Sequence, residues 1–128
     1  MHMDDKVRIL LAEDDTNLGF VIRDNLEQHG FQVDLYQNGQ EALQHFEEAN
    51  YQLCILDVMM PGKDGYSVAK YIRNQSTLDK TAILFLTAKG TPQDKMEGYG
   101  SGAESYIVKP FDNDEIVTRV QEVLQILF

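Results

Sequence analysis

The chain has 128 residues, enough for one compact domain and too few for two, and 43% of them are hydrophobic. Its 21 Asp and Glu outnumber 11 Lys and Arg, and the resulting charge of −10 opposes sequence-independent binding to nucleic acid or anionic lipid. The single cysteine, Cys54, cannot form an internal disulfide, and no apolar stretch approaches the roughly 20 residues of a membrane span. We therefore expect a cytoplasmic domain without membrane contact, formed by residues 7–128, with residues 1–6 as a disordered tag remnant.

Short apolar runs alternate with longer segments of helical period, which predicts βαβ units around a parallel sheet. The predicted strands are residues 7–12, 31–36, 52–56, 82–86 and 105–108. A helix is expected after each strand. The predicted helix starts are Asp15, the capping pair of Asn38 and Glu41, Asp64, Thr91-Pro92, and Asp112 with Glu115.

Polar side chains suited to phosphate chemistry stand directly after four of the predicted strands. Glu13 and Asp14 follow the first, Asp57 the third, Thr87 the fourth and Lys109 the fifth. If the strands are parallel neighbours, these residues meet at one edge of the sheet. Carboxylates, a hydroxyl and an ammonium together suit a divalent cation and a transferable phosphoryl group, because the cations neutralise charge that would repel an incoming phosphate.

Four motifs contain these residues: ILLAEDD at 9–15, LDVMMPGKDG at 56–65, LTA at 86–88 and YIVKPF at 106–111. In order and spacing they resemble the receiver domain of bacterial two-component response regulators over residues 7–127, and most resemble the OmpR/PhoB-type transcription factors. The resemblance implies a flavodoxin-like α/β fold. This fold is a three-layer (βα)5 sandwich with a parallel five-stranded sheet in the order 2-1-3-4-5.

The resemblance also implies a phosphoacceptor and a metal site. Asp57 would attack the phosphohistidine of a sensor histidine kinase or of a histidine phosphotransfer protein, forming an aspartyl phosphate. Asp14 and Asp57 would bind Mg²⁺ directly, Glu13 would bind it through water, and Met59 would contribute its backbone carbonyl. Mn²⁺ is the alternative ion. The domain would be no enzyme beyond catalysing its own phosphorylation and dephosphorylation.

Three further roles follow from the same resemblance. Thr87 and Lys109 would bind the phosphoryl group, which stabilises the aspartyl phosphate over the free carboxylate. The peptide bond between Lys109 and Pro110 would be cis. Tyr106 would act with Thr87 as a switch, moving inward as the threonine moves toward the phosphoryl group. Independently of the resemblance, Gly98, Gly100 and Gly102 lie at the end of the helix that begins at Thr91-Pro92, and because glycine is unfavourable inside helices we expect this helix to be easy to remodel.

The output of the domain is predicted from a partly matching interface. Lys95, Glu104 and Arg119 keep the charges by which OmpR/PhoB-type receivers pair through their fourth helix, fifth strand and fifth helix, whereas Ser105 and Asp114 depart from them. A phosphorylation-dependent homodimer is therefore expected to be weak. DNA would be bound only by an effector domain absent from this chain.

Two other functions are weighed against a transcriptional one. A stand-alone receiver could pass phosphate in a relay or bind a protein target, and only the sequence after residue 128 would distinguish it. A small metal-dependent phosphatase is the remote alternative. Such an enzyme would need a second aspartate two residues after the nucleophile as acid and base, and Met59 stands there.

Overall fold

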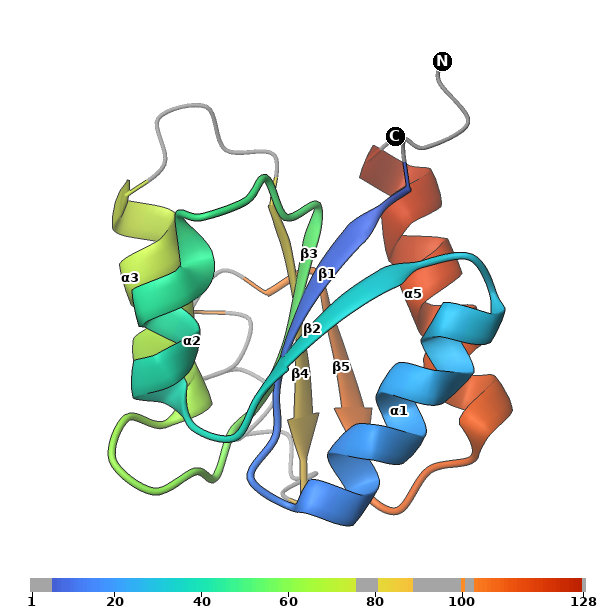
Figure 1. Ribbon diagram of the computed structural model, residues 1–128, viewed down its shortest axis with the longest axis horizontal. Coiled ribbons are helices and arrows are strands. Elements are labelled where there is room, and N and C mark those ends of the chain that lie inside the picture. The colour runs from blue at the N-terminus through green and yellow to red at the C-terminus, as the bar shows by residue number, and fades with distance from the viewer. Residues whose placement is uncertain (1–5, 76–80, 89–99, 101–102, 128) are drawn as a thin grey trace.

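A computed structural model describes residues 6–75, 81–88, 100 and 103–127 of the chain. Its elements, shown in Figure 1, are β1 (Arg8–Ala12), α1 (Thr16–Gln28), β2 (Gln32–Tyr36), α2 (Gly39–Phe46), β3 (Leu53–Asp57), α3 (Gly65–Gln75), β4 (Ala82–Thr87), β5 (Ser105–Val108) and α5 (Asn113–Leu127). The predicted strand bounds are confirmed to within one residue at either end. Residues 1–5 of the tag remnant proposed at 1–6 lie outside the described residues. So does the helix expected from Thr91-Pro92, including Gly98 and Gly102, except for residue 100.

The five strands form one parallel sheet in the order β2-β1-β3-β4-β5, which confirms the predicted flavodoxin-like arrangement. At the carboxyl ends, Ala12 pairs with both Tyr36 and Leu56. Asp57 pairs with Leu86 one residue further along β3. This register aligns the strand ends, so the residues that end or follow β1, β3, β4 and β5 come to one edge.

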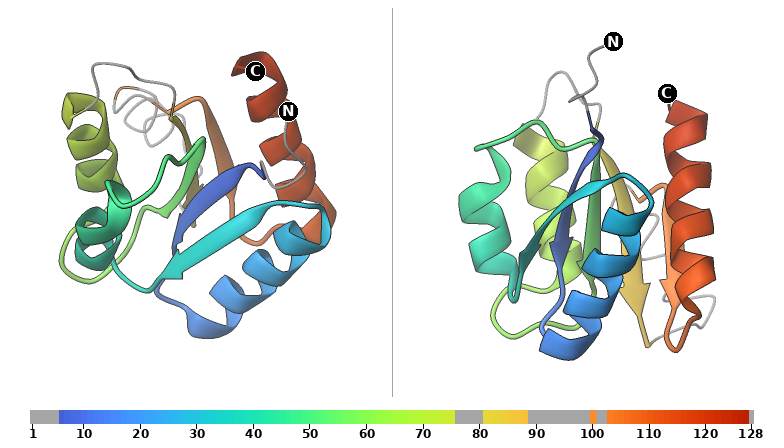
Figure 2. Two further views of the ribbon diagram at one scale, coloured as in Figure 1. Left: turned by 45° about the horizontal axis from the view of Figure 1, so that its top comes forward. Right: turned by 45° about the vertical axis from the view of Figure 1, so that its right-hand side comes forward.

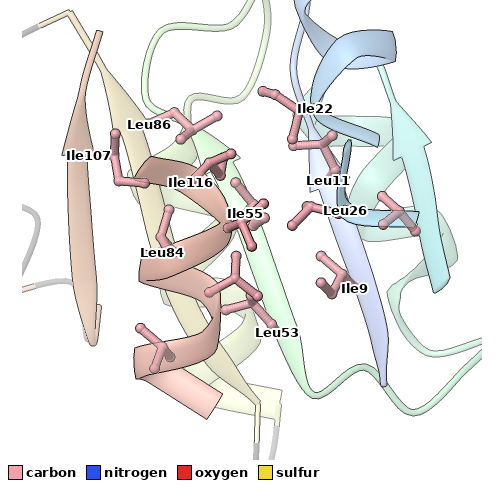
Figure 3. Close-up of a cluster of buried hydrophobic side chains, with 14 of the residues drawn as sticks. Ile9, Leu11, Ile22, Leu26, Leu53, Ile55, Leu84, Leu86, Ile107 and Ile116 are labelled. Atoms are coloured by element: carbon pink, nitrogen blue, oxygen red, sulfur yellow. The ribbon is translucent and has the colours of Figure 1, made fainter. Parts of the chain in front are cut away.

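Helices cover both faces of the sheet, with α1 and α5 on one side and α2 and α3 on the other (Figures 1 and 2). Successive strand residues point to opposite faces, so Ile9 and Leu11 pack in the cluster under α1 and α5, which Figure 3 shows. Leu10 and Ala12 pack in the cluster under α2 and α3. Because both faces are buried, the strands are apolar runs without a polar alternation. Of the helices that the structure describes, none is long and apolar enough to span a membrane.

Side-chain caps set the first turns of α2 and α3. Asn38 Oδ1 accepts the Glu41 N–H at the start of α2, over 2.8 Å. Asp64 Oδ1 accepts the Ser67 N–H at the start of α3, also over 2.8 Å. Such bonds satisfy amides that have no partner inside the helix. The helix starts predicted at Asn38 and Asp64 are confirmed.

Candidate functional site

Backbone hydrogen bonds fix the strand ends that carry the predicted site, at the edge toward which the β4 and β5 arrows point in Figure 1. Glu13 directly follows β1, and its N–H donates to the Tyr36 carbonyl over 3.0 Å. Asp57 is the last residue of β3 and Thr87 the last of β4. Lys109 follows β5, and its N–H donates to the Thr87 carbonyl over 2.7 Å. These residues therefore lie on neighbouring, mutually bonded segments.

Their side chains form an ion cluster of one ammonium between two carboxylates. Lys109 Nζ lies 2.8 Å from Glu13 Oε1 and 3.2 Å from Asp57 Oδ2. Glu13 is fully buried and only 3% of Asp57 is exposed. Charges removed from water in this way need close compensation, and one lysine cannot fully neutralise two carboxylates. The cluster is therefore short of positive charge.

Burial and the shortage of positive charge change the pKa values of Asp57 and Lys109. Burial raises the pKa of Asp57 to about 7, and the hydrogen bond and negative charge of Glu13 act in the same direction, against the opposing charge of Lys109. Burial by itself would lower the pKa of Lys109, but the neighbouring Glu13 and Asp57 outweigh it and raise that pKa. The Lys109 side chain therefore stays charged, while ionising the Asp57 carboxylate costs free energy that an additional cation would offset.

Asp14 completes a set of oxygen atoms that fits such a cation. Glu13, Asp14 and Asp57 each offer one carboxylate oxygen, and these atoms all lie within 4.8 Å of one another. Asp14 is exposed, so the set opens toward solvent. Glu13 Oε1 is buried and forms an ion pair with Lys109, but it accepts no hydrogen bond from the described residues. Carboxylate oxygens are the ligands of hard divalent ions, so the residues fit Mg²⁺ or Mn²⁺.

The other carboxylate oxygens are held by the backbone. Glu13 Oε2 accepts the Asp15 N–H over 3.0 Å, and Asp57 Oδ1 accepts the Met59 N–H over 3.2 Å. The Asp15 side chain caps α1 by accepting the Leu18 N–H over 3.1 Å, which confirms its predicted place at the helix start. The role of the Met59 carbonyl as a metal ligand stays a prediction.

Comparison with known proteins places this site in a family. The profile of the response regulator receiver domain matches residues 9–121. The chain belongs to this family. The receiver domain is 42% identical over 123 residues to the transcriptional regulatory protein RprY of Bacteroides fragilis, covering 96% of this chain and 51% of RprY. It thus spans about half the length of the curated relatives it matches.

Solved structures of receiver domains share the fold. DrrB of Thermotoga maritima, described as an OmpR/PhoB homologue, superposes with a TM-score of 0.85 and 27% identity, over 94% of this chain and 53% of DrrB. TrrA of Thermotoga maritima, solved in complex with Mg²⁺ and BeF, superposes with a TM-score of 0.80 and 34% identity, over 91% of this chain and 98% of TrrA.

The predicted switch residues of the receiver domain are buried. Thr87 has no exposed surface, and 5% of Tyr106 is exposed, within the cluster under α2 and α3. The peptide bond between Lys109 and Pro110 is cis. The coupled movement of Thr87 and Tyr106 stays a prediction.

Glu104, predicted to lie at a dimer interface, is bonded within the chain. Both of its carboxylate oxygens accept from Arg73 Nη2, at 2.7 and 2.8 Å, and Oε2 also accepts the Ile83 N–H. Arg73 Nη1 donates to the Thr81 carbonyl over 2.6 Å. This network joins the end of α3 to the beginnings of β4 and β5. Sequence reasoning missed it, because Arg73 and Glu104 are 31 positions apart and no motif links them.

Arg119, the second described residue of the predicted interface, also contacts its own chain. Its Nη1 lies 3.2 Å from Ser105 Oγ and 3.4 Å from the Tyr106 carbonyl. Ser105, which departs from the expected interface charges, thus places a neutral hydroxyl beside this guanidinium. Lys95 lies outside the described residues. Whether these residues pair two receivers stays a prediction.

A second polar network that the sequence analysis missed supports the edge strand β2. Asp34 Oδ2 accepts from Arg8 Nη2 over 2.8 Å and from the Tyr51 hydroxyl over 2.6 Å. Burial and the adjacent Asp34 raise the pKa of Tyr51, so its hydroxyl remains a neutral donor. The three residues come from β1, β2 and the segment before β3, and only the folded sheet brings them together.

Proposed function

We propose that this receiver domain is phosphorylated on Asp57 by the phosphohistidine of a sensor histidine kinase or of a histidine phosphotransfer protein. The observation that carries the proposal is the ion cluster: a buried carboxylate at the end of the central strand, 3.2 Å from an ammonium and beside two further acids. A phosphoryl group bound there would pair with the Lys109 ammonium, and a divalent cation held by the three acids would neutralise the remaining negative charge.

In the proposed reaction an Asp57 oxygen attacks phosphorus. A P–O bond forms while the P–N bond of phosphohistidine breaks, and its electron pair goes to the imidazole, which takes up a proton. The Lys109 ammonium would pair with the transferred oxygens, and the Thr87 hydroxyl would donate to one of them. Mg²⁺, held by Glu13, Asp14, Asp57 and the Met59 carbonyl, would supply further charge neutralisation. The domain would turn over no other substrate, so we class it as a non-enzyme that catalyses its own phosphorylation and dephosphorylation.

We further propose a cytoplasmic transcriptional output, in which DNA would be bound by an effector domain separate from the receiver domain. Similarity to RprY supports it, since RprY is a transcriptional regulatory protein and is about twice as long as the matched region. A stand-alone receiver that passes phosphate in a relay or binds a protein target is the alternative, and the full-length reading frame would distinguish the two. Phosphorylation would favour a homodimer through the fourth helix, β5 and α5, with Lys95, Glu104 and Arg119 in the interface. Exposed pairs there would contribute about 0–1 kcal/mol each, so the dimer would be weak and salt-sensitive.

The test is labelling with acetyl phosphate. Intact-mass spectra should show one added phosphate with Mg²⁺ present, none with EDTA, and none on Asp57→Asn. Asp24→Asn, which changes an exposed aspartate of α1, should label like the wild type. An adduct that survives in Asp57→Asn, or equal labelling in EDTA, would reject the assignment of acceptor or metal.

A further inference from the structure

Gly39 begins α2 at a point where the helix meets the loop that follows the phosphoacceptor strand. A Cβ built on Gly39 would lie 2.6 Å from the Lys63 carbonyl oxygen and 2.8 Å from Val68 Cγ2. Side-chain atoms can rotate away from such a contact, but a backbone carbonyl cannot. Only glycine therefore lets the start of α2 pack directly on the backbone of Lys63.

Gly65 makes a second close contact on the other side of the same segment. A Cβ on Gly65 would lie 2.5 Å from the Asp57 carbonyl oxygen and 3.0 Å from the Asp57 carbonyl carbon. The Gly65 N–H also donates to the Val58 carbonyl over 3.0 Å. Residues 63–65 are therefore packed between the start of α2 and the backbone of the acceptor itself.

We propose that Gly39 is a positioning residue for Asp57, acting through the backbone of residues 63–65. A methyl group at Gly39 must displace either α2 or this segment. The helix is fixed by its Asn38 cap and by the fully packed Ala42, whereas residues 59–64 have no regular secondary structure. The segment yields, and its displacement reaches Asp57 across the Gly65 contact.

The consequence for reactivity rests on the proposed function. Among the described residues, Asp57 is oriented by a hydrogen bond from the Met59 N–H to Oδ1 and by a charged hydrogen bond from Lys109 Nζ to Oδ2, at 3.2 Å each. A small shift of the Asp57 backbone would move the carboxylate relative to Glu13 and Lys109. Misplacement of a reacting group by about 1 Å can reduce a rate about 100-fold. Gly39 contributes no atom to the ion cluster. A substitution there would therefore change the phosphorylation rate only by moving the Asp57 carboxylate.

The experiment compares Gly39→Ala with Gly19→Ala. Gly19 is a buried helical glycine whose added Cβ would meet the flexible end of Leu35, at 3.0 Å, away from the site. In the metal-free domain, Gly39→Ala should shift the NMR amide resonances of Val58 and Met59, and Gly19→Ala should leave them in place. With Mg²⁺ and acetyl phosphate, Gly39→Ala should label about tenfold or more slowly, and Gly19→Ala within about twofold of wild type.

A second pair of variants decides the matter if Gly39→Ala does not fold. Lys63 is exposed, so Lys63→Gly loosens the backbone of the segment while Lys63→Ala removes only the long side chain. Lys63→Gly should label about threefold or more slowly than Lys63→Ala. Unshifted Val58 and Met59 resonances in folded Gly39→Ala, or equal rates for the two Lys63 variants, would overturn the proposal. A wild-type domain that takes no phosphate would instead reject the proposed function, and the resonance comparison would still test the positioning role.

Discussion

Two groups of charged residues lie at opposite ends of the sheet and are built differently. At the carboxyl ends, Glu13 and Asp57 share the single ammonium of Lys109, and one Glu13 oxygen accepts no hydrogen bond from the described residues. At the amino ends of β4 and β5, Glu104 receives two contacts from Arg73 and a backbone N–H. Matched charges stabilise the fold, whereas the unmatched cluster leaves room for an additional cation. Both ends of the sheet carry charged residues. They differ in whether each carboxylate has a matching cation, as Glu104 has, or shares one, as Glu13 and Asp57 do.

The largest expected effect comes from removing the shared ammonium. Lys109→Ala should lower the rate of acetyl phosphate labelling by about 100-fold or more, because a charge that stabilises the transferred group is lost. The variant should still bind Mg²⁺, since the three acids remain. Labelling kinetics and calorimetric titration with Mg²⁺ measure the two properties. Lys70→Ala, an exposed lysine of α3, is the control, and equal rates for the two variants would place the essential charge elsewhere.

The ion pair of Arg73 and Glu104 should instead affect the stability of the fold. Arg73→Ala and Glu104→Ala should each lower the free energy of unfolding by about 1–3 kcal/mol, because each removes two charge-assisted contacts between side chains that are only 27% and 32% exposed. A double-mutant cycle by urea denaturation should give a coupling of about 1–2 kcal/mol. The exposed pair of Arg23 and Asp24, 4.0 Å apart, should couple by less than about 0.5 kcal/mol in the same assay. A coupling near zero for Arg73 and Glu104 would remove the distinction between the two ends.

The unmatched cluster should gain stability when one acid is neutralised. Because the pKa of Asp57 is raised from 3.8 to about 7, the folded domain binds this proton more tightly than the unfolded chain, and stability falls as pH rises from about 4 to 7. In EDTA, Asp57→Asn should therefore be about 1–3 kcal/mol more stable than wild type at pH 8, and the difference should shrink toward pH 5. Denaturant unfolding at both pH values measures it, with Asp24→Asn as the control. A difference that grows toward acid pH would contradict the charge shortage.

The smallest effect is expected at Asp15, which lies near the ion cluster in the sequence and caps α1. It contacts Glu13 only through its backbone N–H. Asp15→Ala should cost about 1 kcal/mol of stability, and Asp15→Asn, which keeps the cap, less than about 0.5 kcal/mol. Neither should change Mg²⁺ affinity more than about twofold. A larger loss of affinity in Asp15→Asn would extend the metal site to Asp15 as a fourth acid.

The fold and the members of the ion cluster could be predicted because their causes are local or topological. Apolar runs buried on both faces identify parallel strands, and a residue after such a run comes to the carboxyl edge wherever the strand lies in the sheet. Asp57 and Lys109 meet for this reason, although they are 52 positions apart.

The rest depends on distances that no local pattern encodes. Glu104 carries the charge expected of an interface acid, yet its side chain bonds within the chain because Arg73, in the last turn of α3, lies beside it. From the sequence, Gly39 is an ordinary residue at the start of a helix. Only the folded chain brings the Lys63 carbonyl so close to it that a larger residue would not fit. The raised pKa of Asp57 follows likewise from burial and from Glu13, which the folded sheet brings close.

The backbone along the carboxyl edge is cross-linked from strand to strand. Beyond the regular ladders, Glu13 donates to Tyr36, Val58 to Leu86 over 2.9 Å, and Lys109 to Thr87. These bonds resist sliding of one strand end past another. A phosphoryl group attached at this edge would therefore change side-chain torsion angles, while the backbone register between neighbouring strands would stay the same.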